Sequence, residues 1–306
     1  MLNWASARGD PSLTQLHRAA SKVRLLSVES NAQIPDGSIR NFKVRIDVMD
    51  LRFRSHAKQM FGAAAIIMLT SLSHVSIAWP QDLKELSFAT DPTYPPFEFS
   101  KDGVLVGFDI DLLAAIGKAA GFKAKLESVP FDGIIPALKA GTYDGAMAAM
   151  SANEERAKSI AFSKPYFKTG LVIVVPSNDN SILREADLKG KRIAVEIGSV
   201  GATRAATIPD AHISTFNTPN SLLELASGNV DAAIGDASQV NYAVATGEVR
   251  GIKVIPGLIS TDFYVIGLPK ESKNESLINS GLAKVIDSGE YATIYKKWFG
   301  EDPMKF

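Results

Sequence analysis

The sequence predicts an α/β fold of open, mostly parallel sheets that are covered by helices on both faces. From residue 86 onward, short apolar runs of strand length alternate with segments whose apolar residues recur at helical spacing. Such alternation is typical of parallel sheets, because a helix must carry the chain back between two parallel strands. The 306 residues are 46% hydrophobic, which is enough to build one large core or two small ones.

The first half of this region contains four expected strands and two expected helices. Asp109 can cap the first helix, and Gly121 can end it. Residues 171–175 run Leu-Val-Ile-Val-Val, which is too rich in β-branched side chains for a helix. The expected strands are 86–90, 123–129, 145–150 and 168–176, and the expected helices are 109–120 and 134–140.

The second half continues the alternation. A Gly-rich turn follows a short strand and leads into a helix from about Gly201. Two amphipathic helices occupy the last part of the region. The expected strands are 192–195, 232–234 and 263–268, and the further helices are 222–227, 238–245, 276–288 and 291–299.

Charge and residue counts disfavour several classes of function. Residues 1–78 carry 10 Lys and Arg against 5 Asp and Glu, whereas residues 79–306 carry 23 against 28. An acidic body disfavours nucleic-acid binding, which needs a basic surface. The chain has no cysteine, so thiol catalysis, disulfides and cysteine-ligated zinc are excluded. Only His212 of the four histidines lies in the body, so a histidine-based triad or metal site is disfavoured, and we expect no cofactor.

Residues 49–78 have the three-part layout of a secretory signal peptide. Three basic residues form a positive start, residues 60–72 are apolar, and residues 76–78 are Ser-Ile-Ala, which places small residues where a signal peptidase cuts. The apolar run is shorter than the ~20 residues that a membrane-spanning helix needs. A membrane anchor or a buried helix is the alternative interpretation.

A signal peptide begins at the initiator, but 48 residues precede Met49. They show no sustained helical or strand period. We therefore expect translation to start at Met49 and residues 1–48 to lie outside the protein that is made. The mature chain would begin near Trp79 and would be periplasmic.

Ligands of open α/β sheets bind at the carboxyl ends of strands, so the loops that follow strands are where site residues are expected. The loop after the first strand contains Asp91, Tyr94 and three prolines, which stiffen it. Tyr94 can cover a ligand there, and Asp91 can attract a cation. Phe131, after the next strand, can form an opposite wall. The alternatives are a packed surface loop for the first segment and a core position for Phe131.

Arg156 lies in the first turn of a helix that Ser151 or Asn153 can cap. A cation in this turn opposes the helix dipole, so it does not stabilise the helix. Its guanidinium suits a ligand carboxylate, which it can bind through two parallel hydrogen bonds. A surface ion pair with a neighbouring glutamate is the alternative.

Two further loops carry polar groups. In the turn at 196–203, backbone N–H groups can receive an anion, and Ser199 and Thr203 add hydroxyls. No Gly-Lys-Ser/Thr ending is present, so this turn is not a phosphate-binding loop. Asp236 can bind an ammonium group or cap the following helix. Together the loops offer groups for an anion, a cation and an apolar side chain, which is the pattern of a free amino acid.

Seven segments, each weak alone, occur in an order and spacing that are specific together. They are TDPTYPPFEF (90–99), VGFDIDLLAAI (106–116), FDGIIPALKAGTYDGAMAAM (131–150), EERAKSIAFSKPY (154–166), LKGKRIAVEIGS (188–199), VDAAIGD (230–236) and YKKWFG (295–300). Through them, residues 84–300 resemble the extracellular solute-binding proteins of polar amino-acid ABC importers. The glutamine-binding and lysine/arginine/ornithine-binding proteins are familiar members of that family.

The resemblance implies the type II periplasmic binding protein fold, in which two α/β lobes are joined by two hinge strands and the ligand lies in the cleft. One lobe would contain residues 79–172 and 266–306, and the other would contain residues 173–265. The two crossings would lie near Leu171–Val175 and Tyr264–Leu268.

The resemblance also implies a ligand site. In the family, the arginine matching Arg156 holds the α-carboxylate of the ligand, and the aspartate matching Asp236 takes the α-ammonium. Aromatic residues sandwich the side chain, and the aspartate matching Asp91 reaches its polar end. The matching positions here are Asp91, Tyr94, Phe131, Ala149, Met150, Ser151, Arg156, Glu196, Ser199, Val200, Gly201 and Asp236.

Three of these positions depart from the family's pattern. Ala149 stands where some members have Ser or Gly, and Val200 replaces a hydroxyl residue. Glu196 occupies a place where the glutamine binder has Lys. An acidic pocket would favour a cationic or amide side chain over an acidic one, and an opine or another amino-acid derivative fits as well.

The resemblance thus predicts a monomeric binding protein, not an enzyme, that delivers its ligand to the membrane permease of an ABC importer. The main alternative is a periplasmic enzyme of the same fold, such as a cyclohexadienyl dehydratase, in which Glu196 would act as acid or base. The sensor domain of a membrane receptor is a third interpretation.

Overall fold

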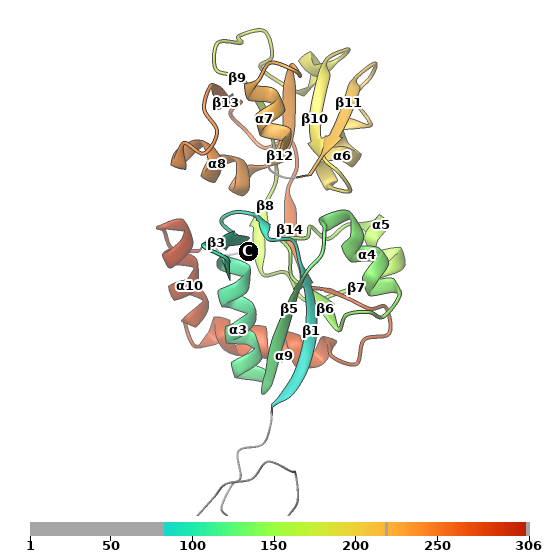
Figure 1. The fold of residues 1–306 in the computed structure, drawn as a ribbon, viewed down its shortest axis with the longest axis vertical. Coiled ribbons are helices and arrows are strands. Elements are labelled where there is room, and N and C mark those ends of the chain that lie inside the picture. The colour runs from blue at the N-terminus through green and yellow to red at the C-terminus, as the bar shows by residue number, and fades with distance from the viewer. Residues whose placement is uncertain (1–82, 218–219, 304–306) are drawn as a thin grey trace, which may run out of the picture. The chain divides into compact units, whose positions relative to one another are not determined.

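The computed structural model describes residues 83–217 and 220–303, so the expected signal peptide and residues 1–48 lie outside the described part. The described strands form two five-stranded sheets, a three-stranded sheet and a two-stranded ribbon (Figure 1). The expected fold has two mixed, mostly parallel sheets, and both five-stranded sheets are mixed. In both, two strand pairings are parallel and two are antiparallel.

The first sheet has the strand order β5-β1-β6-β15-β7 and defines the first lobe. Strand β1 pairs in parallel with β5 along its whole length, and β15 is antiparallel to both of its neighbours. A small three-stranded sheet, β2-β3-β4, follows β1 in the sequence. The strands are β1 (Lys84–Thr90), β2 (Thr93–Tyr94), β3 (Glu98–Lys101), β4 (Val104–Val106), β5 (Phe122–Ser128), β6 (Gly145–Ala146), β7 (Ala161–Phe162) and β15 (Gly267–Leu268).

Helices cover both faces of the first sheet (Figure 1). One face packs against α3 (Phe108–Ala120), α9 (Glu275–Asp287) and α10 (Glu290–Phe299) in a core rich in aromatic rings. The other face packs against α4 (Phe131–Lys139) in a smaller aliphatic core, and α5 (Glu154–Ser159) follows β6. The first lobe is therefore built from both ends of the described chain.

The second sheet has the order β11-β10-β12-β9-β13 and defines the second lobe. Helix α6 lies on one face, while α7 and α8 lie on the other. The strand β11 was missed because four of its five residues are exposed, so it lacks an apolar pattern. The elements are β9 (Leu171–Pro176), the 3-10 turn η3 (Glu185–Leu188), β10 (Arg192–Glu196), α6 (Val200–Ala205), β11 (His212–Phe216), α7 (Asn220–Ala226), β12 (Ala232–Asp236), α8 (Ala237–Thr246) and β13 (Ile252–Val254).

Strands β8 (Phe167–Thr169) and β14 (Asp262–Tyr264) form an antiparallel ribbon between the two lobes (Figure 1). The crossing expected near Tyr264–Leu268 begins in β14, whereas the one expected near Leu171–Val175 is displaced to β8. Leu171–Val175 lies inside β9, which pairs with β12 on one side and β13 on the other, and this explains its fully apolar composition. Gly170 lies between β8 and β9, and a side chain is not tolerated there, because a Cβ would lie 2.2 Å from the Ser260 carbonyl oxygen.

The expectation that Asp109 caps α3 was wrong. The N-cap is Gly107, whose φ is 144° and whose missing Cβ leaves room for the Phe97 carbonyl oxygen, 1.9 Å from where a Cβ would lie. Asp109 lies inside the first turn and is fully buried. It accepts hydrogen bonds from the backbone N–H of Ala149 and from the Tyr166 hydroxyl instead. The expected end of the helix at Gly121, in the left-handed conformation, is confirmed.

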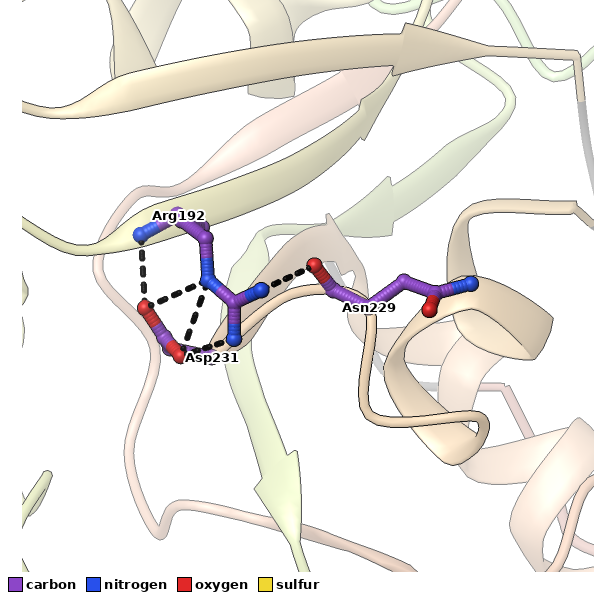
Figure 2. A network of polar contacts seen from close by, with 3 residues as sticks. All are labelled: Arg192, Asn229 and Asp231. Atoms are coloured by element: carbon purple, nitrogen blue, oxygen red, sulfur yellow. Dashed lines mark hydrogen bonds and ion pairs between the residues drawn. The ribbon is translucent and has the colours of Figure 1, made fainter.

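A polar network holds the amino ends of two strands of the second sheet together (Figure 2). The Arg192 guanidinium, at the start of β10, donates to both carboxylate oxygens of Asp231 and to the Asn229 carbonyl oxygen. The Arg192 backbone N–H also donates to Asp231, just before β12. The group is largely exposed, so we expect it to fix local geometry and to contribute at most about 1 kcal/mol.

Candidate functional site

A cavity is lined by loops of the first lobe and by the carboxyl ends of β10 and β12 in the second. It contains eleven of the twelve residues that the sequence predicted. These are Asp91, Tyr94, Phe131, Ala149, Ser151, Arg156, Glu196, Ser199, Val200, Gly201 and Asp236.

Met150 is the expected residue that does not line the cavity. Its side chain is fully buried in the aliphatic core of the first lobe with Ile134 and Ile160. The neighbouring Ala149 packs instead against the aromatic core on the other side of the first sheet.

Arg156 connects the two sides of the cavity. Asn153 caps α5 by accepting a hydrogen bond from the Arg156 backbone N–H at 2.8 Å, as one of the two predicted caps. The guanidinium donates to the Ser151 carbonyl oxygen at 2.6 Å and, across the cavity, to the Gly198 carbonyl oxygen at 3.0 Å. Burial lowers the pKa of Arg156 to about 10, with Glu196 opposing the shift, so the group is cationic at neutral pH. A surface ion pair is excluded, because Arg156 is only 6% exposed.

Asp91 and the two aromatic residues form the wall on the first lobe. One Asp91 carboxylate oxygen accepts from the Phe131 backbone N–H at 2.9 Å, and the other accepts from the Thr93 hydroxyl. Asp91 therefore fixes the start of α4, and each oxygen keeps a further lone pair for a ligand. The Arg156 guanidinium lies 5.3 Å from the centre of the Phe131 ring, within cation–π distance. Tyr94 packs its ring against Phe97.

Behind Tyr94 lies a pair of buried carboxyl groups, Glu98 and Asp109. Glu98 also lines the cavity. Burial raises the pKa of Glu98 well above its usual value, and the adjacent Asp109 raises it further. Burial raises the pKa of Asp109 to about 6, although hydrogen bonds from Tyr166 and Ala149 oppose the shift. Two neighbouring carboxyl groups without a cation are best satisfied when one keeps its proton, so we expect Glu98 to donate to Asp109.

The Glu98–Asp109 pair supports the backbone of the cavity. One Asp109 oxygen accepts from the Ala149 N–H at 2.9 Å. Ala149 has a φ of 43°, which is uncommon for a residue with a side chain and costs about 1–3 kcal/mol. Asp109 thus holds a strained residue in place directly beside the cavity.

On the second lobe, the start of α6 provides backbone donors. Ser199 is the N-cap and accepts from the Ala202 N–H at 3.0 Å. The N–H groups of Val200 and Gly201 belong to the first turn and have no acceptor within the helix. The Gly201 Cα lies close to β12, since a Cβ there would be 3.0 Å from the Ile234 carbonyl oxygen.

Asp236 ends β12 and caps α8. Its carboxylate accepts from the Thr169 hydroxyl, in the ribbon between the lobes, and from the Ser238 N–H. Burial raises the pKa of Asp236 to about 7, although these hydrogen bonds oppose the shift. The side chain is only 7% exposed, so a ligand cation would be the natural partner for its charge.

Glu196, at the end of β10, adds a further carboxylate to the lining. Its charge opposes the lowering of the Arg156 pKa by burial, and it adds to the raised pKa of Tyr94, which is caused mainly by burial and by the charge of Asp236. The cavity therefore combines one guanidinium with several carboxyl groups, which favours a ligand that carries one anionic and more than one cationic or donor group.

Several lining residues were not predicted. They are Glu98, Ala148, Leu171, Ser221, Ile234, Gly235 and Gln239. A signal was present for Glu98, which is the acid between two phenylalanines in the stiff proline loop.

In the described part of the chain, no group of three or more His, Cys, Asp or Glu side chains is placed to hold a metal ion. Nor is any helix among residues 83–217 and 220–303 long and apolar enough to cross a membrane.

Two α/β lobes joined by a two-stranded ribbon, with a charged cavity where the strands end, define a type II periplasmic binding protein. The chain belongs to the bacterial extracellular solute-binding proteins, family 3, whose family model matches residues 86–301. Both the family resemblance and the fold class expected from the sequence are thus confirmed.

Curated relatives and solved structures agree with this assignment. A probable histidine-binding protein of Campylobacter jejuni is 31% identical over 223 residues, which cover 70% of this chain and 84% of the relative. ABC transporter arginine-binding protein 1 of Escherichia coli is 31% identical over 226 residues, covering 71% and 91%. The arginine-, lysine-, histidine-binding protein ArtJ from Geobacillus stearothermophilus has a TM-score of 0.69 and 34% identity, covering 72% of this chain and 97% of that one.

A further solved structure bears on the enzyme alternative. It is an ancestral amino acid-binding protein, AncCDT-1, described as a precursor of cyclohexadienyl dehydratase. Its TM-score is 0.65 with 32% identity, and the match covers 70% of this chain and 95% of that one.

Proposed function

We propose that the protein binds an amino acid or amino-acid derivative with a polar or cationic side chain and delivers it to the membrane permease of an ABC importer. Arg156 is the observation that carries this proposal. A buried arginine that already bridges both walls of a cavity has spare N–H donors for a carboxylate, and Asp236 offers a partner for an ammonium. The relatives' names, which refer to arginine and histidine binding, support the same ligand class.

In this proposal each of the eleven expected residues that line the cavity has a role. Arg156 and the start of α6, with Ser151 and Ser199, hold the α-carboxylate. Asp236 holds the α-ammonium. Tyr94 and Phe131 enclose the side chain, while Asp91 and Glu196 bind its polar end. Ala149, Val200 and Gly201 shape the wall through their backbone.

The lobes close on the ligand by a hinge motion. We take the β8–β14 ribbon as the hinge, with the first lobe before β8 and after β14 and the second lobe from β9 to β13. The boundaries expected at residues 172/173 and 265/266 therefore move by a few residues. Contacts from both lobes favour the closed state, because a ligand shifts the equilibrium only by its differential affinity. The working protein is a periplasmic monomer that is exported by the signal peptide at residues 49–78, and it does not bind nucleic acid.

Thermal unfolding with a panel of candidate ligands tests this function. The panel contains the amino acids, common opines and a prephenate-type acid. A ligand present at 1,000 times its Kd adds roughly 4 kcal/mol, or on the order of 8–16 °C in Tm for a protein of this size. A large shift with one or a few amino acids or derivatives is expected.

The enzyme alternative has one specific observation in its favour, namely the raised pKa values of Glu98 and Asp236 in the cavity. Both groups already have partners that fit a binding site. Turnover of the prephenate-type acid, without a shift from any amino acid or derivative, would replace the binding proposal with an enzymatic one.

A further inference from the structure

The Thr169 hydroxyl connects the hinge ribbon to the carboxylate of Asp236. Thr169 ends β8, is only 6% exposed and donates a hydrogen bond to one Asp236 carboxylate oxygen. The same oxygen accepts from the Ser238 N–H at 3.4 Å, at the start of α8. The hydroxyl oxygens of Thr169 and Ser238 lie 3.2 Å apart. These contacts come from the hinge and from α8, and together they fix the direction in which the carboxylate points.

The backbone at Asp236 is attached to the same hinge segment. Asp236 is the register partner of Leu171 where β12 pairs with β9. The Ala237 N–H donates to the Gly170 carbonyl oxygen at 2.8 Å. Residues 169–171 therefore contact both the side chain and the backbone at the point where β12 leads into α8. Asp236 belongs to the cavity lining and Thr169 does not, so Thr169 can act on a ligand only through Asp236.

The Thr169 hydroxyl also bears on the charge of Asp236. A ligand ammonium carries only donors, so it needs an ionised carboxylate as its partner. Burial opposes ionisation and raises the pKa of Asp236 to about 7, and the hydrogen bond from Thr169 is the largest of the effects that lower it again. A donor that faces a carboxylate favours its charged form, because hydrogen bonds to ionised groups are the strong ones.

Other groups near Asp236 do not replace this hydrogen bond. The charged and titratable side chains that surround it or share its cavity are Tyr94, Arg156, Glu196, Asp262 and Tyr264. The charge of Asp262, in β14, raises the Asp236 pKa further. The Tyr264 hydroxyl is buried and makes no hydrogen bond with any residue in the described part of the chain. The main side-chain donor to the Asp236 carboxylate is therefore Thr169.

We propose that Thr169 is a positioning residue for ligand binding, which holds the Asp236 carboxylate from β8 in the orientation and charge state that a ligand ammonium needs. The inference rests on the proposed function, because Asp236 keeps its role. Without the hydroxyl, a proton competes with the ligand for Asp236 up to a higher pH. The loss of affinity should therefore depend on pH, whereas a merely loosened hinge would weaken binding equally at every pH.

Isothermal titration calorimetry at pH 6 and pH 8 tests this inference, with arginine and glutamine as the probes. Neither side chain titrates in this range, and the proteins are compared at the same pH. Thr169→Val keeps the shape of the side chain and removes the hydroxyl. Its affinity should fall about tenfold below that of the wild type at pH 6, but by less than about threefold at pH 8. Thr169→Ser keeps the hydroxyl and should bind within about twofold of the wild type at both pH values.

Thr93→Val is the matched control. The Thr93 hydroxyl donates to the Asp91 carboxylate at 2.8 Å, so the same substitution removes the same kind of bond from a different carboxylate of the cavity. Any affinity that this variant loses should be lost equally at pH 6 and pH 8. Circular dichroism checks that each variant is folded, and Thr169→Ala carries the same expectation if the valine variant does not fold.

The inference is overturned if removal of the Thr169 hydroxyl leaves the affinity unchanged, or if the loss is the same at both pH values. A loss in Thr169→Ser as large as that in Thr169→Val would also overturn it. In each of these cases the wild type still binds, so the proposed function stands. If the folded wild type binds neither arginine nor glutamine, both the inference and the proposed ligand class are contradicted.

Discussion

The two walls of the cavity are built by different means. On the first lobe, side chains are fixed by hydrogen bonds within that lobe: Asp91 by the Phe131 N–H, and Arg156 by the Ser151 carbonyl in addition to its bond across the cavity to Gly198. On the second lobe, the starts of α6 and α8 present their caps and backbone N–H groups. Ligand binding by the first wall should therefore depend on which side chains are present, and binding by the second wall on the path of the backbone. Asp236 contributes in both ways, since it caps α8 and its carboxylate can bind a ligand cation.

The largest effect is expected at Arg156. Arg156→Ala removes the only guanidinium in the described lining and the bond across the cavity to Gly198, so ligand affinity should fall by more than about 100-fold. Arg156→Lys keeps the charge but loses the planar pair of donors, and it should recover only part of the affinity. Calorimetric titration measures both variants.

Circular dichroism should show that Arg156→Ala remains folded. Near-wild-type affinity in that variant would overturn the assignment of the first wall. Lys158→Ala, on the exposed side of the same helix, serves as the control and should bind like the wild type.

The second effect concerns Asp236 and pH. In the empty cavity its pKa is about 7, and a ligand ammonium should lower it. Affinity should therefore decline as the pH falls below 7, approaching tenfold per pH unit. Asp236→Asn should weaken binding at pH 8 by about tenfold or more and abolish this dependence. Calorimetric titrations from pH 5 to 8 measure the pH dependence of the affinity. A wild-type affinity that is constant over this range would contradict the proposal that Asp236 binds the ligand ammonium.

Asp236 also affects the stability of the empty protein, with a pH dependence opposite to that of ligand affinity. Because the folded pKa of Asp236 lies above its usual value of 3.8, the folded state holds the proton more tightly than the unfolded chain. Its contribution to stability is then complete below about pH 4 and is lost as the pH rises through 7. Asp236→Asn should remove that decline, as seen by comparing the Tm of the two proteins between pH 5 and 8.

A smaller effect is expected from the buried pair behind Tyr94. Glu98→Gln replaces a protonated carboxyl with an amide that can also donate to Asp109, so the Tm should change by no more than about 2 °C. Glu98→Ala leaves Asp109 without this donor and should lower the free energy of unfolding by about 1–3 kcal/mol. Differential scanning calorimetry distinguishes the two. Equal losses in both variants would indicate that Glu98 is ionised rather than protonated.

The smallest effect is expected at Val200. If the start of α6 binds through backbone N–H groups, Val200→Ala should change ligand affinity by less than about threefold. A loss of tenfold or more would show that the side chain matters, and the second wall would then resemble the first. Calorimetric titration under the conditions used for Arg156→Ala provides the comparison.

The roles of residues that end or cap helices through local contacts were predicted well. The roles of residues that depend on tertiary contacts were not. Gly121 and Asn153 act locally, through a left-handed turn and a cap, and both were found from the sequence. Asp109 has an equally good local pattern for a cap, but its carboxylate bonds to Ala149, forty positions away. No local rule reveals such a contact.

The candidate site shows the same limit. The charged and aromatic residues of the cavity were visible because they follow strands whose ends must meet. Gln239 and Ser221 were missed because an amide or a hydroxyl in a first helical turn is ordinary. Only the folded structure shows that both residues line the cavity. Met150 was misplaced because the direction of a side chain depends on the register of a short segment whose strand, β6, proved to have only two residues.

The first lobe takes residues from both ends of the described chain, and this affects the order in which the protein can fold during synthesis. Phe108, in α3, packs its ring against Tyr295, in α10, with ring centres 5.9 Å apart. The second lobe is contained in one continuous stretch and can assemble as soon as it emerges. The aromatic core of the first lobe must wait for its last helix, because contacts between distant parts of the sequence form late. A nascent chain stalled before residue 290 should therefore present a protease-resistant second lobe and an unfinished first one.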